Sequence, residues 1–175
     1  ARVHLCRISS AEGVELVRAA KQEGLAVTAD VSINSLHLSD HDIGYFDSRA
    51  RVTPVLRQQR DRDALRAALA DGTIDVLVSD HTPVDVDAKA LPFAEAESGA
   101  TGLELLLSLS LKWANDSQVG LSRALDVLTS QPAKVLGKIA GQSESLGQLQ
   151  VGGVADLVVF DPTVEWHVTP DALHS

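Results

Sequence analysis

A carboxylate and an imidazole stand side by side where a short apolar run ends. The run at 74–78 is rich in β-branched residues, which is typical of a strand buried on both faces. It stops at Ser79-Asp80-His81, and Pro83 cannot continue a central strand because it has no N–H to donate. Side chains capable of acid–base chemistry sit at such strand ends in α/β enzymes. The alternative is that Asp80 caps a helix or belongs to a turn.

The elements that must position Asp80 alternate between strand and helix. A cap at 9–12 opens a helix that stops before Gly24, and a second helix ends at Gly72, which suits a left-handed C-cap. This alternation argues for parallel strands with helices packed outside, in a (β/α) barrel or an open sheet. The strands expected in this part are 3–8, 25–31, 51–56 and 74–79, and the second helix is expected at 62–70.

Polar residues follow each of these expected strands. In a barrel, the carboxyl ends of parallel strands share one rim, so Arg7, Asn34, Thr53 and Asp80 would meet there. Asp80 is the carboxylate placed directly at a strand end. The stretch 32–38 is expected to be an exit loop.

The second half of the chain changes character twice. We expect 85–101 to be a long loop, of the kind that is usually functional. Turns rich in glycine then introduce a small β element from about residue 145. The remaining expected elements are helices at 102–114 and 121–128, a short helix ending at 136, and strands at 155–160 and 164–168.

Composition excludes several classes of protein. Of the 175 residues, 45% are hydrophobic and 22% are charged, as in ordinary globular domains. A net charge of −9 disfavours nucleic acid and anionic membranes as partners, and no apolar run approaches the roughly 20 residues of a membrane span. A single cysteine, Cys6, allows no internal disulfide and fits a cytoplasmic protein. Because residue 1 already enters a strand-like run, we expect this chain to be part of a longer polypeptide.

Several segments resemble the dihydroorotases of the cyclic amidohydrolase superfamily, in consistent order along almost the whole chain. They include the corner Ser79-Asp80-His81-Thr82-Pro83. The resemblance implies the C-terminal half of a TIM-type (β/α) barrel at 1–140, followed by part of a small β-sandwich at 141–175. The segments that carry it are 4–13, 51–57, 72–83, 92–96, 99–104, 128–137 and 152–161.

The family uses one or two zinc ions held at the strand ends, and an Asp after the last strand moves the proton of the attacking water. The resemblance places Asp80 at that position, as a vestigial proton shuttle. It places Arg7 and Asn34 where the family has zinc-binding histidines. A guanidinium has no lone pair to give, and an amide is a poor zinc ligand beside imidazole. The pocket positions it implies are Arg7, Asn34, Thr53, His81, Val84 and Gly99.

Other histidines do not restore a ligand set in the sequence pattern. His37 and His81 form no ligand pair at metal spacing, and His4 alternates onto the face of Cys6, away from the rim. We therefore expect no bound metal or other cofactor. Arg7 could instead pair with Asp80 and neutralise it, because an unpaired buried charge is costly.

The pattern of losses resembles dihydroorotase-like polypeptides that have lost their zinc ligands and partner aspartate transcarbamoylase in the pyrimidine pathway. The resemblance implies a structural subunit of a homo- and hetero-oligomer that includes the aspartate transcarbamoylase catalytic subunit. One alternative is an active zinc-dependent dihydroorotase or related cyclic amidohydrolase, using Asp80 with ligands from elsewhere in the polypeptide. A second alternative is a sensor that binds a small molecule in the old pocket.

Overall fold

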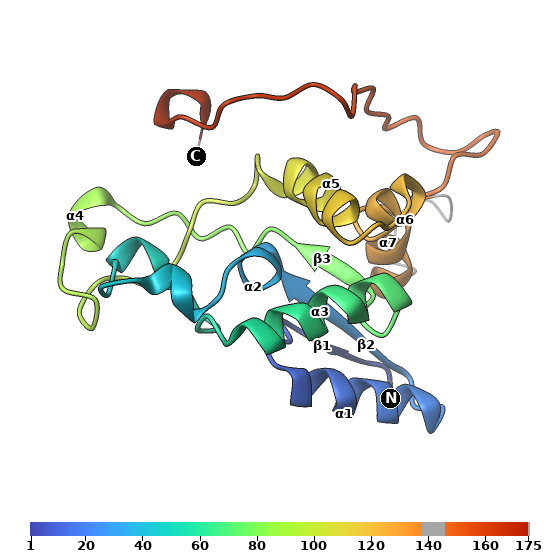
Figure 1. Cartoon of the computed structure of the whole chain (residues 1–175). Helices are drawn as coiled ribbons and strands as arrows, with labels where there is room; N and C mark the ends of the chain where they lie inside the picture. The colour runs from blue at the N-terminus through green and yellow to red at the C-terminus, as the bar shows by residue number, and fades with distance from the viewer. Residues whose placement is uncertain (138–145, 175) are drawn as a thin grey trace.

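A computed structural model describes residues 1–137 and 146–174. Three parallel strands form the sheet in the order β1-β2-β3, and helices α1 and α3 lie together against it (Figure 1). The elements in chain order are β1 (Val3–Leu5), α1 (Ala11–Gln22), β2 (Val27–Ser32), α2 (Ile33–His37), η1 (Asp40–Ile43), η2 (Ser48–Ala50), α3 (Gln59–Asp71), β3 (Val76–Val78), α4 (Val86–Lys89), α5 (Leu106–Asp116), α6 (Leu121–Asp126), α7 (Ser130–Leu136) and η3 (Pro170–Ala172).

Strand register sorts the side chains of the sheet onto two faces. β1 pairs with β2 so that His4 lies beside Thr28, and β2 pairs with β3 so that Asp30 lies beside Val76. Because side chains alternate along a strand, Val31 enters the core against the helices, and Thr28 and Asp30 share the opposite face. The predicted parallel β–α alternation is confirmed.

The helix ends follow the capping residues in the sequence. Ser10 Oγ accepts a hydrogen bond from Gly13 N at 3.1 Å and begins α1, as predicted. Gly72 adopts φ +85° after α3, where a side chain would be strained, so the predicted left-handed cap is also confirmed. The core between helices and sheet consists of Val14, Val31, Ile33, Leu36, Leu65, Ala68, Leu69, Ile74, Leu77, Trp113, Ala114, Ala124 and Val127.

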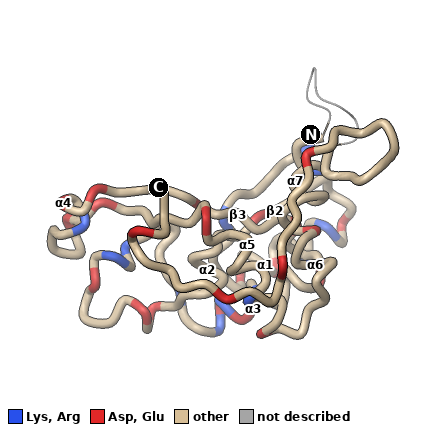
Figure 2. The backbone as a smooth tube through the Cα atoms, turned by 90° about the horizontal axis from the view of Figure 1, so that it is seen from above, with Lys and Arg blue, Asp and Glu red and all other residues tan. Residues whose placement is uncertain are grey.

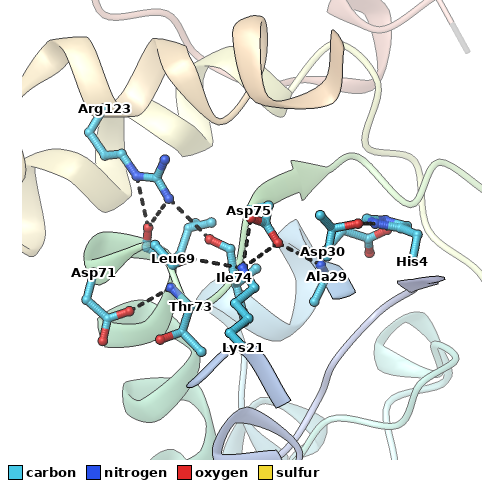
Figure 3. A network of polar contacts seen from close by, with 12 residues as sticks. His4, Lys21, Ala29, Asp30, Leu69, Asp71, Thr73, Ile74, Asp75 and Arg123 are labelled. Atoms are coloured by element: carbon cyan, nitrogen blue, oxygen red, sulfur yellow. Dashed lines mark hydrogen bonds and ion pairs between the residues drawn. The ribbon is translucent and has the colours of Figure 1, made fainter. Parts of the chain in front are cut away.

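Two partly buried cations, Arg123 and Lys21, stabilise the turn between α3 and β3 (Figure 3). The Arg123 guanidinium donates to the carbonyl oxygens of Leu69 and Ile74 at 2.8 and 3.1 Å. Lys21 Nζ lies 2.8 Å from Asp75, whose carboxylate also accepts from Ala29 N at 2.8 Å. These contacts satisfy backbone groups in the last turn of α3, in the turn before β3 and in β2, and they fix β3 relative to α1 and α6.

Three expectations near the rim are corrected. The first strand ends at Leu5 rather than at residue 8, because Arg7 adopts φ +57°. The stretch 32–38 is not a loop but contains α2, capped by Ser32 Oγ, which accepts from Asn34 N at 3.1 Å. The stretch 51–56 forms no strand, since Pro54 has no N–H to donate to a neighbouring strand.

Expectations for the second half are corrected as well. The loop at 85–101 contains the short helix α4, and the helix expected at 102–114 begins later, at Leu106. The strands expected at 155–160 and 164–168 are not formed, because the described residues offer this segment no neighbouring strand with which to pair. The start of the hairpin expected from 145 lies outside the described residues. The division at residue 140 stays a prediction.

Acidic and basic residues are interspersed along the described chain rather than separated (Figure 2). Across the part that the structure describes, no helix combines the length and apolarity that crossing a bilayer requires. The C-terminal segment runs along α5 and away from the sheet (Figure 1). There Trp166 Nε1 donates to Ser108 Oγ at 3.0 Å, which ties this segment to α5.

Candidate functional site

Polar residues that follow β1, β2 and β3 meet around a small cavity at the carboxyl ends of the strands. The cavity has a volume of about 150 Å³. Its walls come from three strand ends and from the segments at 52–53 and 98–100. The lining residues are Arg7, Asn34, Val52, Thr53, Asp80, Thr82, Ser98, Gly99 and Ala100.

An arginine and a carboxylate face each other in this cavity. Arg7 Nη1 lies 3.4 Å from Asp80 Oδ1 and donates to the Thr53 carbonyl oxygen at 3.2 Å. The Asp80 side chain is 13% exposed, and that of Arg7 is 45% exposed. The ion pair expected from the sequence is therefore present, and the cation partly neutralises a carboxylate that is largely shielded from water.

The backbone at both residues takes an uncommon conformation. Arg7 has φ +57° and Asp80 has φ +49°, in the left-handed region that is unusual for residues other than glycine. Arg7 N donates to Asp30 Oδ1 at 2.7 Å, which holds the turn after β1. Such strain persists only where surrounding contacts enforce it, and it is concentrated at functional sites.

The far wall of the cavity is closely packed. Thr53 Oγ1 and Ser98 Oγ are hydrogen bonded at 2.7 Å. Gly99 has φ +154°, and a Cβ added there would lie 2.4 Å from the Thr82 carbonyl oxygen. A glycine is therefore required where this loop crosses the strand end. Ser98 was missed by sequence reasoning, because nothing in the pattern at 85–101 indicates which loop residue returns to the rim.

The structure brings most, but not all, of the predicted pocket residues together. Arg7, Asn34, Thr53, Asp80 and Gly99 line the cavity. His81 and Val84 do not. His81 Nδ1 instead accepts hydrogen bonds from the backbone N–H groups of Gly102 and Leu103 at 3.1 and 3.2 Å, so its ring anchors the segment before α5. Val84 lies behind Gly99, where its Cγ2 would be 2.9 Å from an added Cβ.

A second histidine that sequence reasoning weighed as a ligand, His37, packs between two helices. His37 Nε2 is 2.9 Å from the carbonyl oxygen of Leu109, in the contact between α2 and α5. Burial lowers the pKa of His37 to about 4, because the charged imidazolium is poorly solvated there.

A second polar group lies on the sheet face below the cavity. His4, Cys6 and Asp30 each offer one ligand atom, and these atoms lie within 4.8 Å of one another. Partial desolvation and the neighbouring Asp30 carboxylate both raise the pKa of the Cys6 thiol. Sequence reasoning placed His4 and Cys6 on one face but did not connect them to Asp30. The signal that could have found this group is side-chain alternation along the adjacent strand, which places Thr28 and Asp30 on one face.

The rim residues do not fit the zinc centre that the resemblance implies. Arg7 directs a guanidinium, not a lone pair, toward Asp80, and Asn34 offers only an amide. Among the residues 1–137 and 146–174, the group His4, Cys6 and Asp30 is the one set of three potential ligands that comes together, and Asp80 is not part of it. No catalytic step through a rim metal follows from this arrangement.

Comparison with known proteins identifies the relatives of this chain. Residues 1–175 match the amidohydrolase family. A dihydroorotase-like protein of Pseudomonas putida is 43% identical over 161 residues, which are 92% of this chain and 37% of that protein. A dihydroorotase of Desulfotalea psychrophila is 39% identical over 165 residues, which are 94% of this chain and 38% of that protein.

Comparison with solved structures supports the same family relationship. An L-hydantoinase from Arthrobacter aurescens superimposes with a TM-score of 0.78 at 30% identity, covering 88% of this chain and 34% of that chain. The fold is thus part of a TIM-type barrel of the hydantoinase and dihydroorotase kind, as the sequence predicted. The chain spans 37% and 38% of the length of the two curated relatives. The chain belongs to the amidohydrolase family, among the dihydroorotase-like cyclic amidohydrolases.

Proposed function

We propose that this chain is part of a non-catalytic dihydroorotase-like protein, which serves as a structural subunit of an aspartate transcarbamoylase complex in pyrimidine biosynthesis. The single observation that carries the proposal is the contact between Arg7 and Asp80, 3.4 Å apart at the rim. A permanent cation occupies the space beside the carboxylate that a catalytic metal would need. Electrostatic repulsion between the guanidinium and Zn²⁺ disfavours a metal there.

The lining of the cavity also supports a scaffold over an enzyme. Within the described residues, Asn34 and Thr53 line this cavity of about 150 Å³ and no imidazole does, so this chain places no histidine ligand beside Asp80. The relative at 43% identity carries the name dihydroorotase-like protein, which agrees with a dihydroorotase-like chain. The well-packed core and a described rim that lacks histidine ligands together fit a protein that keeps its shape for assembly.

The competing function is an active zinc-dependent dihydroorotase. Relatives named dihydroorotase, at 35–39% identity, favour it. It requires the Arg7 side chain to swing away from Asp80, and a metal held by ligands outside this chain. Dihydroorotate turnover by the zinc-loaded full-length protein separates the two functions.

The assembly role is tested by mixing the full-length protein with the aspartate transcarbamoylase catalytic subunit and measuring molar mass by size-exclusion chromatography with light scattering. We expect one species heavier than either component. Separate elution of both components at micromolar concentrations contradicts the partner assignment.

A small-molecule sensor is distinguished by calorimetry. Titration of the full-length protein with dihydroorotate and with carbamoyl aspartate should give no binding heat if the rim is only a scaffold. Saturable binding that is lost in Arg7→Met, without turnover, would instead assign a sensing role to the cavity.

A further inference from the structure

Two neighbouring strands and the residue that follows the first of them bring nitrogen, sulfur and oxygen ligand atoms together. His4 of β1 is in register with Thr28 of β2, and Cys6, directly after β1, lies near Asp30 of β2. The ligand atoms of His4, Cys6 and Asp30 lie within 4.8 Å of one another. Figure 3 shows the His4 ring directed toward Asp30. None of these three residues lines the rim cavity. The cavity and this group are linked by one backbone contact, from Arg7 N to Asp30.

Each of the two ring nitrogens of His4 has a defined partner. Nδ1 is 2.8 Å from Thr28 Oγ1, and Nε2 is 2.9 Å from Asp30 Oδ2. Histidine ligands of metals nearly always donate their second ring N–H to an oxygen atom, which fixes the tautomer and the ring orientation. With the Nδ1 proton donated to Thr28, the Nε2 lone pair is available to a metal ion placed between it and Asp30 Oδ2.

The carboxylate is equally well fixed. The Asp30 side chain is 7% exposed, and its Oδ1 accepts from Arg7 N at 2.7 Å. The other oxygen, Oδ2, remains directed at His4. An anion buried this deeply is stabilised by a cation beside it. A metal ion held between Asp30 Oδ2 and His4 would supply that charge.

We propose that His4, Cys6 and Asp30 form a binding site for a divalent transition metal, with Zn²⁺ the best match. Imidazole, thiolate and carboxylate are all zinc ligands, and a fourth position would be filled by water or another group. A thiolate and a carboxylate together balance the charge of a divalent ion.

The geometry requires only a small adjustment. In a tetrahedral centre with Zn–N and Zn–S bonds of about 2.1 and 2.3 Å, ligand atoms lie roughly 3.3–3.8 Å apart. The Nε2–Oδ2 distance of 2.9 Å must open by about 0.4 Å, and separations of up to 4.8 Å must close by about 1 Å, which a change in the Cys6 side-chain rotamer can supply. Cys6 is exposed, so it can turn without disturbing the core.

The test uses Co²⁺ as a spectroscopic probe of the full-length protein, in a buffer without thiols. Within this chain Cys6 is the sole cysteine, so a sulfur-to-cobalt charge-transfer band that is lost in Cys6→Ser reports this thiolate directly. Zn²⁺ affinity is measured in parallel by competition with a chromophoric chelator. We expect the band in the wild type and its loss in Cys6→Ser, with Zn²⁺ affinity lowered at least about 100-fold. Loss of a hydrogen bond that only supports a ligand lowers metal affinity about 10- to 100-fold. Thr28→Val should therefore lower the Zn²⁺ affinity by an amount in that smaller range.

Matched variants distinguish this site from others. His41 lies exposed in η1, so His41→Gln should keep both the band and the affinity, whereas His4→Gln should lose them. Asp80→Asn should also keep both. Absence of a charge-transfer band at saturating Co²⁺, or a band and Zn²⁺ affinity unaltered in Cys6→Ser and His4→Gln, overturns the proposal. Binding that is lost in Asp80→Asn but retained in Cys6→Ser overturns it too, and would place the metal at the rim. Circular dichroism of each variant verifies that it is folded.

Discussion

The Arg7–Asp80 pair predicts a measurable coupling between two rim residues. Coulomb's law for unit charges 3.4 Å apart in a dielectric constant of about 80 gives about 1.2 kcal/mol. Because Arg7 is 45% exposed, ordering its side chain and screening by salt offset part of this energy. We therefore expect a coupling free energy of about 0.5–1 kcal/mol, favourable to folding.

A double-mutant cycle with Arg7→Met, Asp80→Asn and the combined variant measures that coupling. Urea unfolding of the full-length protein supplies the four free energies of unfolding, and the slopes against urea must agree for the cycle to hold. The coupling should shrink between 0.05 and about 0.5 M salt, where the Debye length falls below about 5 Å. A coupling of zero, or one of opposite sign at low salt, refutes the view that Arg7 neutralises Asp80.

Three further perturbations test the structure around the site. Arg123→Met should lower the free energy of unfolding by about 2–3 kcal/mol, because it leaves two buried carbonyl oxygens without their charged donor. The control is Arg49→Met, at a side chain that is 86% exposed, which should change the free energy of unfolding by less than about 0.5 kcal/mol. Urea unfolding of both variants measures the difference. Gly99→Ala should destabilise by more than about 2 kcal/mol, since its Cβ would lie 2.4 Å from the Thr82 carbonyl oxygen, and a thermal midpoint equal to the wild type contradicts that packing. The pKa of His37 is lowered to about 4, so the unfolded chain binds its proton more readily; stability from His37 is complete above pH 6.5 and is lost as pH falls toward 4. His37→Gln should flatten the stability profile in that window, and an unchanged slope rules out His37 as its source.

The sequence predicted the elements whose signals are local. A run of β-branched residues predicted β3, and the caps at Ser10 and Gly72 predicted the start of α1 and the end of α3. The meeting of Arg7 and Asp80 followed from one rule, that parallel strands end on the same side.

The features that could not be predicted from the sequence depend on residues that are distant in the chain. The segment 155–160 has the composition of a strand, but strand formation requires a neighbour, and its local pattern cannot say whether one is present. The group of His4, Cys6 and Asp30 depends on the register between β1 and β2, which no single segment reveals. α2 was missed because Ser32 reads equally well as a loop residue and as a helix cap.

The proposed structural role requires that the full-length protein does not hydrolyse a cyclic amide at this rim. The most direct test is the rate of dihydroorotate hydrolysis by the full-length protein after saturation with Zn²⁺, beside an Asp80→Asn variant treated in the same way. We expect both rates to equal that of the buffer with zinc alone. Turnover by the wild type that disappears in Asp80→Asn would contradict it, because Asp80 would then still transfer protons to and from a metal-activated water.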